Sequence, residues 1–106
     1  DSSVECTCHF HNTYGLGMAN VMAAMRVGVT SFETSFAGLG GCPFTKVAAG
    51  NVATEDFVNA LQLHGQREDI DLHRLIGVAG DVARYFEREM PGCVYKTGSI
   101  RSEEAV

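Results

Sequence analysis

The chain has 106 residues, 45% of them apolar and 20% charged, with a net charge of −5. Its length is that of one domain at most, and its composition is that of a globular protein. The acidic balance and the scattered basic residues argue against a nucleic-acid partner, and no apolar run approaches the roughly 18 residues that a membrane span needs.

The first third of the chain predicts a βαβ unit. Residues Val4–His11 are expected to form a buried strand, because the run is rich in β-branched and sulfur-containing residues and ends in a turn. Residues Met18–Val27 predict a helix that is apolar nearly all round, and Gly28 suits its C-terminal cap. Residues Ser31–Ala37 predict a second strand. This order predicts two parallel strands with a right-handed crossover.

A long glycine-rich loop, Gly38–Gly50, follows the second predicted strand. It contains Lys46 and the unshielded backbone amides of Gly40 and Gly41. Loops of this length inside a compact domain are usually functional, so we expect this one to carry part of a site.

Two more helices are predicted after the loop. Thr54 is a suitable N-cap for a helix that runs to about Leu63. Asp71 caps a last helix, Leu72–Arg88, whose apolar residues recur at helical spacing, and a Pro-Gly pair stops it. The tail, Cys93–Val106, is expected to be partly extended and then polar and loose. Two parallel strands with about three helices make an incomplete sheet, which predicts a part of a larger α/β architecture.

Two histidines lie at the end of the first predicted strand. His9 and His11 are two residues apart, so both imidazoles point to one face while Phe10 turns away. Such a pair before a glycine turn suggests a divalent metal, and the alternative is two ordinary polar residues at a strand end. Asn51 is open to a similar alternative, a turn residue before a helix. Glu33 in a buried strand needs a partner or a role at the metal site.

The four cysteines provide little support for a cysteine-based metal site. Cys6, Cys8, Cys42 and Cys93 match no zinc-ribbon or CxxC spacing. We interpret all four as reduced thiols of a cytoplasmic or organelle-matrix protein.

Four sequence blocks carry a family resemblance. In order, they are His9–Gly15, Met18–Val21, Ala37–Phe44 and Gly50–Asp56. From about Val4 to about Gly98 the chain resembles the C-terminal part of the hydroxymethylglutaryl-CoA lyase family, in the metal-dependent lyase and synthase TIM-barrel superfamily. The resemblance implies an α/β fold in which residues 1–106 form the C-terminal portion of a (β/α)8 barrel. The two predicted strands would be its seventh and eighth.

The resemblance also implies a set of site residues. It implies a divalent cation, Mg²⁺ or Mn²⁺, bound by His9, His11 and Asn51, and it makes Cys42 the catalytic cysteine. The residues placed around the metal or in the substrate loop are Asn12, Glu33, Gly40 and Gly41.

The reaction implied by the resemblance is a carbon–carbon cleavage of an acyl-CoA substrate. The family splits 3-hydroxy-3-methylglutaryl-CoA into acetyl-CoA and acetoacetate, a retro-Claisen step of leucine degradation and ketone-body metabolism. Asn12 departs from the Asp that is frequent in the family and is shared with the condensing synthases, whereas the Gly-Cys-Pro loop favours the lyases. A synthase of the same superfamily and a non-catalytic docking module are the alternatives.

One family motif does not occur in the sequence. The family has an Arg-Asp-Gly motif that supplies an Asp ligand and a catalytic Arg, and this chain has none. A whole barrel takes roughly 250 residues. We therefore expect the isolated chain to be inactive, and we expect a missing barrel half or a homo-oligomer to cover its sheet edges.

Overall fold

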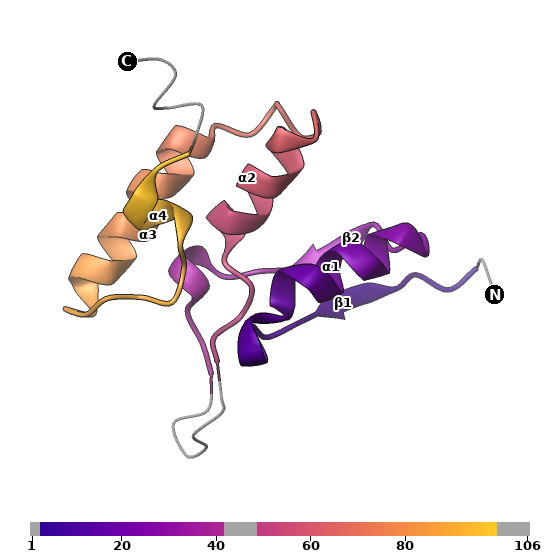
Figure 1. Cartoon of the computed structure of the whole chain (residues 1–106), viewed down its shortest axis with the longest axis horizontal. Coiled ribbons are helices and arrows are strands. Elements are labelled where there is room, and N and C mark those ends of the chain that lie inside the picture. The colour runs from indigo at the N-terminus through magenta and orange to yellow at the C-terminus, as the bar shows by residue number, and fades with distance from the viewer. Residues whose placement is uncertain (1–2, 42–48, 100–106) are drawn as a thin grey trace.

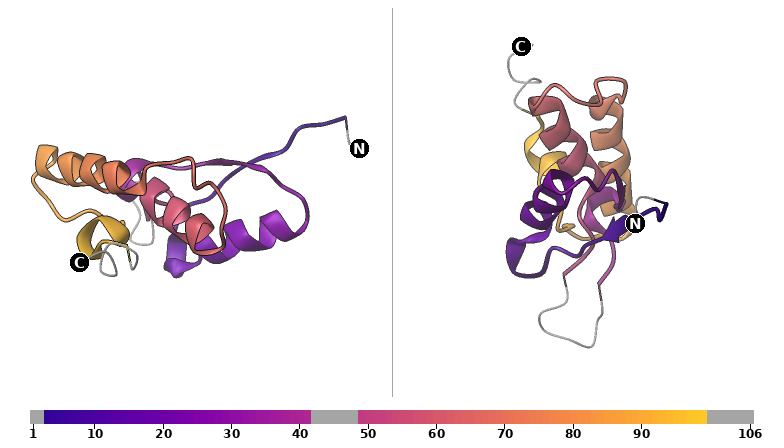
Figure 2. Two further views of the ribbon diagram at one scale, coloured as in Figure 1. Left: turned by 90° about the horizontal axis from the view of Figure 1, so that it is seen from above. Right: turned by 90° about the vertical axis from the view of Figure 1, so that its right-hand side faces the viewer.

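The computed structural model describes residues 3–41 and 49–99. The elements are, in order, β1 (Thr7–His9), a 3-10 turn η1 (Thr13–Gly15), α1 (Gly17–Arg26), β2 (Ser31–Glu33), a 3-10 turn η2 (Phe36–Gly38), α2 (Thr54–Leu63), α3 (Leu72–Tyr85) and α4 (Val94–Thr97). Helix α2 lies between the βαβ unit on one side and helices α3 and α4 on the other (Figure 1). The whole is a flat slab of 45 × 39 × 20 Å (Figure 2).

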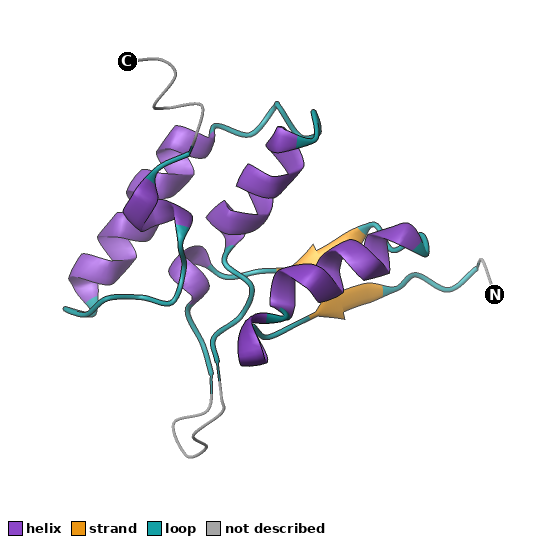
Figure 3. Cartoon of the chain, in the orientation of Figure 1, coloured by secondary structure: helices purple, strands orange, loops and turns teal. Residues whose placement is uncertain are grey.

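The predicted parallel pairing of the two strands is confirmed, but both strands are shorter than expected. Strands β1 and β2 pair in the register Thr7↔Ser31, Cys8↔Phe32 and His9↔Glu33, and helices dominate the rest of the chain (Figure 3). The prediction of a buried first strand is wrong, because Val4 is 70% exposed and Thr7 and His9 are exposed too. In the described part of the chain each strand has only the other as a neighbour, which leaves one edge of each open.

Two small apolar clusters hold the elements together. The first joins α1 to α2 through the buried Val21, Val52 and Phe57, with Phe32 edge-on against Phe57. The second is built on Ala37, Ala79 and Met90, so it joins η2 to α3 and the segment before α4. Only Gly17 and Val21 of α1 are buried, so most of this helix, which is apolar nearly all round, is not covered by the described part of the chain.

Of three predicted helix ends, two are confirmed and one is wrong. Gly28 lies just beyond the end of α1 with φ +98°, as a C-terminal glycine should. Asp71 caps α3, since its carboxylate accepts from the backbone N–H of Arg74 at 3.1 Å. Thr54 is not an N-cap: the cap of α2 is Ala53, and the Thr54 hydroxyl bonds that of Thr34 at 2.8 Å.

Helix α3 ends at Tyr85, three residues before the predicted Arg88. The backbone N–H groups of Glu87 and Arg88 donate to the carbonyls of Arg84 and Ala83, and Glu87 has φ +52°. This is a Schellman ending with glutamate where glycine is usual, so no residue type in the sequence signals it. The tail is also not extended at its start, because residues Val94–Thr97 form the short helix α4.

Candidate metal site

The two histidines of the HxH motif meet at their ring nitrogens. His9 lies at the end of β1 and His11 two residues later, so both rings project from the same face. The rings stack with an interplanar angle of 8° and centroids 5.2 Å apart. Their Nε2 atoms are 3.3 Å apart.

In each ring, the partner of Nδ1 determines which nitrogen carries the hydrogen. His9 Nδ1 is 2.7 Å from the Glu33 carboxylate, its neighbour in the strand register, and His11 Nδ1 is 2.8 Å from the Ala49 carbonyl. Both partners are acceptors, so each Nδ1 must donate its hydrogen. In the neutral rings both Nε2 atoms therefore carry lone pairs, and these lone pairs face each other.

The third predicted ligand, Asn51, is brought next to His11 by a short extended segment. Residues 49–53 run between the ends of the two strands: Asn51 pairs with His11 as an antiparallel bridge, and Ala53 pairs with Ser35 as a parallel one. Residues opposite each other in such a bridge present their side chains on the same face. The Asn51 amide donates from Nδ2 to the Leu39 carbonyl at 2.9 Å, and its buried Oδ1 has no hydrogen-bond partner among the described residues.

The donor types of these three side chains suit a divalent cation. Two nitrogens bound at about 2.1 Å to one ion can be at most about 4.2 Å apart, and the two Nε2 atoms meet this limit. A buried amide oxygen is a suitable hard ligand, and a carboxylate behind a ligating imidazole is the usual outer partner. Among the described residues, no group of three or more His, Cys, Asp or Glu side chains could hold a metal ion.

Glycines allow the two arms of the predicted loop to approach each other. We call residues 38–41 and 49–51 the neck, and its two arms run side by side (Figure 1). A Cβ on Gly50 would lie 1.7 Å from the Gly38 carbonyl oxygen, and one on Gly40 would lie 2.5 Å from Asn51 Nδ2. A Cβ on Gly41 would lie 3.0 Å from the Ala49 carbonyl oxygen. Gly40 therefore packs directly against the Asn51 amide, and Gly41 packs against the Ala49 carbonyl that accepts from His11.

The remaining predicted site residues lie in different places. Asn12 accepts from the Gly17 N–H at 3.0 Å through Oδ1, so it caps the start of α1 beside the neck. Glu33, with 62% of its side chain exposed, is not buried as predicted, and it contacts His9. Cys42, the predicted catalytic residue, lies outside the described residues.

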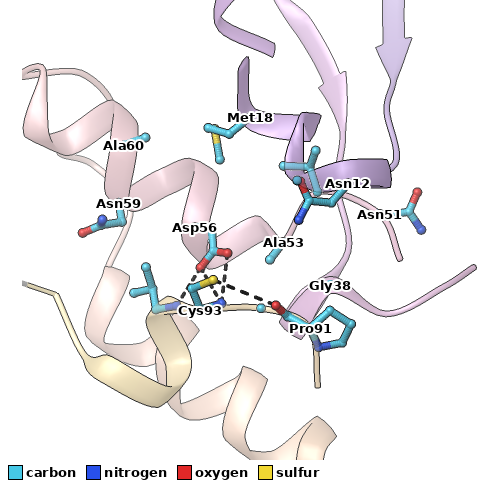
Figure 4. A pocket seen from close by; sticks show the side chains of 14 residues that line it. Asn12, Met18, Gly38, Asn51, Ala53, Asp56, Asn59, Ala60, Pro91 and Cys93 are labelled. Atoms are coloured by element: carbon cyan, nitrogen blue, oxygen red, sulfur yellow. Dashed lines mark hydrogen bonds between the residues drawn. The ribbon is translucent and has the colours of Figure 1, made fainter. Parts of the chain in front are cut away.

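A pocket of about 340 Å³ lies between α1, α2 and the segment before α4, and two predicted site residues, Asn12 and Asn51, are among those that line it. Asp56 faces it, and its carboxylate accepts from the backbone N–H of Val94 at 2.7 Å and of Cys93 at 3.0 Å (Figure 4). The Asn51 amide points away from Asp56 in this view (Figure 4). The Asp56 carboxylate is thus engaged with backbone amides.

Sequence reasoning missed Glu55, an acid that is fully buried. Its Oε1 accepts from the Ala37 N–H at 2.9 Å, and its Oε2 has no hydrogen-bond partner in the described part of the chain. Burial raises the pKa of Glu55, although the bond from Ala37 opposes this shift. Nothing in the sequence signals that η2 folds over this side chain.

Comparison with known proteins gives one consistent picture. The HMGL-like family model matches residues 2–82. Mitochondrial hydroxymethylglutaryl-CoA lyase of Arabidopsis thaliana is 42% identical over 80 residues, which are 76% of this chain and 17% of the relative. (R)-citramalyl-CoA lyase of Chloroflexus aurantiacus is 40% identical over 97 residues, which are 92% of this chain and 31% of the relative.

A solved structure has the same arrangement. An HMG-CoA lyase from Acinetobacter baumannii, in complex with coenzyme A and 3-methylmalate, superposes with a TM-score of 0.81 at 42% identity. The match covers 89% of this chain and 31% of that one. The chain thus spans less than a third of each of these relatives, and its two strands and four helices are a part of a TIM barrel.

Proposed function

The chain belongs to the HMGL-like family, and we propose that it supplies the cation-binding C-terminal part of an acyl-CoA carbon–carbon lyase. The observation that carries this proposal is the pair of facing Nε2 atoms 3.3 Å apart, each fixed by an acceptor behind its ring. A strand end that only exposed two polar side chains would not need both tautomers fixed in this way.

We assign the binding of Mg²⁺ or Mn²⁺ to His9, His11 and Asn51. A bound divalent cation would supply Lewis-acid polarisation of substrate oxygens. Nitrogen ligands favour Mn²⁺ over Mg²⁺, and an additional carboxylate would favour either ion. Glu33 holds His9 in the ligating tautomer, and the Ala49 carbonyl does the same for His11.

The proposed reaction is the cleavage of a 3-hydroxy-3-methylglutaryl-CoA-like thioester. A base takes the proton of the tertiary hydroxyl, and the oxygen forms the ketone of acetoacetate as the carbon–carbon bond breaks. The electron pair of that bond passes to the thioester enolate, and protonation of its carbon completes acetyl-CoA. We assign this last proton to the Cys42 thiol, on the strength of the family resemblance.

The acyl group has one specific alternative. The relative that covers most of this chain among those described above is a citramalyl-CoA lyase. The same metal-binding residues would serve a citramalyl thioester, since in both substrates the carbon that bears the tertiary hydroxyl is one end of the bond that breaks. A condensing synthase of the superfamily would run carbon–carbon bond formation on the same ligands.

A chimera tests the proposal. Residues 4–98 replace the matching segment in the Acinetobacter baumannii lyase, and acetyl-CoA release is assayed with Mn²⁺ and 3-hydroxy-3-methylglutaryl-CoA, then with citramalyl-CoA. We expect cleavage of one thioester and its loss in the His9→Ala and His11→Ala chimeras. A folded chimera that binds no Mn²⁺ and cleaves neither thioester would refute the proposal.

The isolated chain serves as the second arm. We expect no acetoacetate release above background when the isolated chain is mixed with Mn²⁺ and thioester. Three ligands leave coordination positions of the cation unfilled, and this chain supplies only part of a substrate pocket. Turnover by the isolated chain at the rate of an ordinary enzyme would contradict the need for the rest of a barrel.

A further inference from the structure

We propose that His11 and Asn51 each bind the cation on one side and one arm of the neck on the other, so that cation binding and the hydrogen bonds of the neck form a single coupled equilibrium. This inference rests on the proposed function, because it takes the two residues as ligands. It adds that the neck is part of the metal site and determines its affinity.

Asn51 holds the first arm of the neck, residues 38–41. Its Nδ2 donates to the Leu39 carbonyl at 2.9 Å, and this contact fixes the amide orientation, since a flipped amide would place two acceptor oxygens against each other. The opposite end of the same amide, Oδ1, is buried and has no hydrogen-bond partner in residues 3–41 and 49–99. An amide can serve both sides at once, whereas an aspartate at this position could serve only the cation.

His11 holds the second arm of the neck, residues 49–51. Its Nδ1 donates to the Ala49 carbonyl at 2.8 Å, and its Nε2 faces His9. The backbone N–H of the next residue, Asn12, donates to the Gly50 carbonyl at 2.9 Å, so the β1 end and the second arm are joined twice. If Ala49 moved away, His11 Nδ1 would lose its acceptor, and the hydrogen of the ring would no longer be held on Nδ1.

The two arms also determine each other's position. The Asn51 N–H donates to the Leu39 carbonyl at 3.4 Å, and the space for a Cβ on Gly40 is taken by the Asn51 amide. Linkage then requires reciprocity: whatever stabilises the neck strengthens the cation site, and the cation protects the neck by the same factor.

The first test changes the neck without changing a ligand. In Gly40→Ala the new methyl group, at φ +122°, would lie 2.5 Å from Asn51 Nδ2. Gly65→Ala is the matched control, because Gly65 also has positive φ (+75°) but has nothing within 4 Å of the new methyl group. Mn²⁺ binding is measured from the electron paramagnetic resonance signal of the free ion. We expect Gly40→Ala to weaken binding by about tenfold, as loss of an outer partner does, and Gly65→Ala to leave it within about twofold.

The second test removes one of the two sides of Asn51. Asn51→Asp keeps an oxygen for the cation but sets a carboxylate against the Leu39 carbonyl. Without metal, we expect faster hydrogen exchange at the amides of Asn12 and residue 51, read by mass spectrometry. Asn59→Asp adds the same charge on α2, away from the neck, and should leave both amides unchanged. In the wild-type chain Mn²⁺ should slow exchange at these amides, and in Asn51→Asp this protection should be reduced.

The outcomes separate the two proposals. No Mn²⁺ binding by the wild-type chain would overturn the proposed function, and the coupling with it. Binding by the wild-type chain with unchanged affinity in Gly40→Ala and unchanged amide protection in Asn51→Asp would overturn the coupling alone. If Gly40→Ala does not fold, as judged by circular dichroism, the exchange measurements on Asn51→Asp decide.

Discussion

At the scale of single residues, the His9–Glu33 contact is the part of the candidate site that can be altered with least risk to the fold. The two residues are register partners on β1 and β2, and their side chains are 50% and 62% exposed. An exposed pair of this kind adds little to stability. Its effect should therefore appear in metal binding, where it fixes the ligating tautomer of His9.

We predict that Glu33→Ala weakens Mn²⁺ binding by about tenfold while the thermal unfolding midpoint changes little. The physical reason is that His9 loses the acceptor for Nδ1–H and can rotate or change tautomer. Titration of the free-ion resonance signal measures the affinity. Glu5→Ala removes the same charge from an exposed position before β1 and serves as the control. Equal affinities in the two variants would remove Glu33 from the site.

Glu55 illustrates the opposite case, a buried carboxyl that affects stability. Its pKa is raised, chiefly because burial disfavours the charged form. Between the usual value of about 4.3 and the raised value, the folded state binds more protons than the unfolded state. The free energy of unfolding therefore falls as the pH rises through this window, and it is highest below it.

We predict that Glu55→Gln removes this pH dependence. Glutamine keeps the oxygen that accepts from the Ala37 N–H but carries no charge, so its advantage over the wild type should be largest above the window and smallest below it. Urea unfolding at a series of pH values measures the difference. Glu5→Gln controls for the loss of one charge at an exposed position. A parallel course for wild type and Glu55→Gln would show that Glu55 does not titrate in this way.

At the scale of elements, a side chain of helix α2 caps the start of helix α4. Helix α4 has no cap from its own N-cap residue, Cys93, and the Asp56 carboxylate of α2 accepts from the N–H groups of Cys93 and Val94 instead. A helix of four residues has little stability of its own. Asp56 is thus the residue on which the docking of α4 depends.

We predict that Asp56→Ala destabilises the chain by about 1–2 kcal/mol and releases α4 before global unfolding. Hydrogen exchange should rise at the amides of Lys96 and Gly98, whose partners are the carbonyls of Cys93 and Val94. Asp71→Ala removes a cap within α3 and should affect only the start of that helix. Fast exchange spread equally over α2 and α4 in Asp56→Ala would argue against local release.

The sequence predicted those elements whose signals are local. The parallel strand pair, the helix ending at Leu63 and the Asp71 cap all follow from periodicity, glycine positions and capping residues. The convergence of the two imidazoles followed from the two-residue spacing alone. The short strands, the Glu87 helix end and the extended segment at residues 49–53 depend on contacts between distant parts of the chain, which periodicity does not record.

The candidate site, too, was predicted only where its signals are local. Residue types and spacing identified the predicted ligands, but not the acceptors behind them or the role of Gly40. The ligand roles of His9, His11 and Asn51, and the catalytic role of Cys42, remain predictions.

At the scale of the molecule, the slab shape and the exposed strands belong together. The radius of gyration is 14.4 Å, whereas a compact domain of this length has about 13 Å. Each strand has one open edge in the described part of the chain, and the exposed apolar side chains of Val4 and Val27 line one hollow with Thr7 and Ser31, where the two strands begin. Unpaired edges of this kind invite pairing with another chain.

We predict that the isolated chain associates through these edges. Sedimentation velocity over a range of concentrations should show a rising weight-average sedimentation coefficient, with or without Mn²⁺. Coexpression with the remaining part of a family barrel should replace this association by a defined complex, because the barrel strands would cover the same edges. A monomer that stays stable at high concentration and ignores the complementary barrel part would show that two short strands and their helices suffice on their own. That result would count against a partial barrel that needs covering, and equally against a docking module.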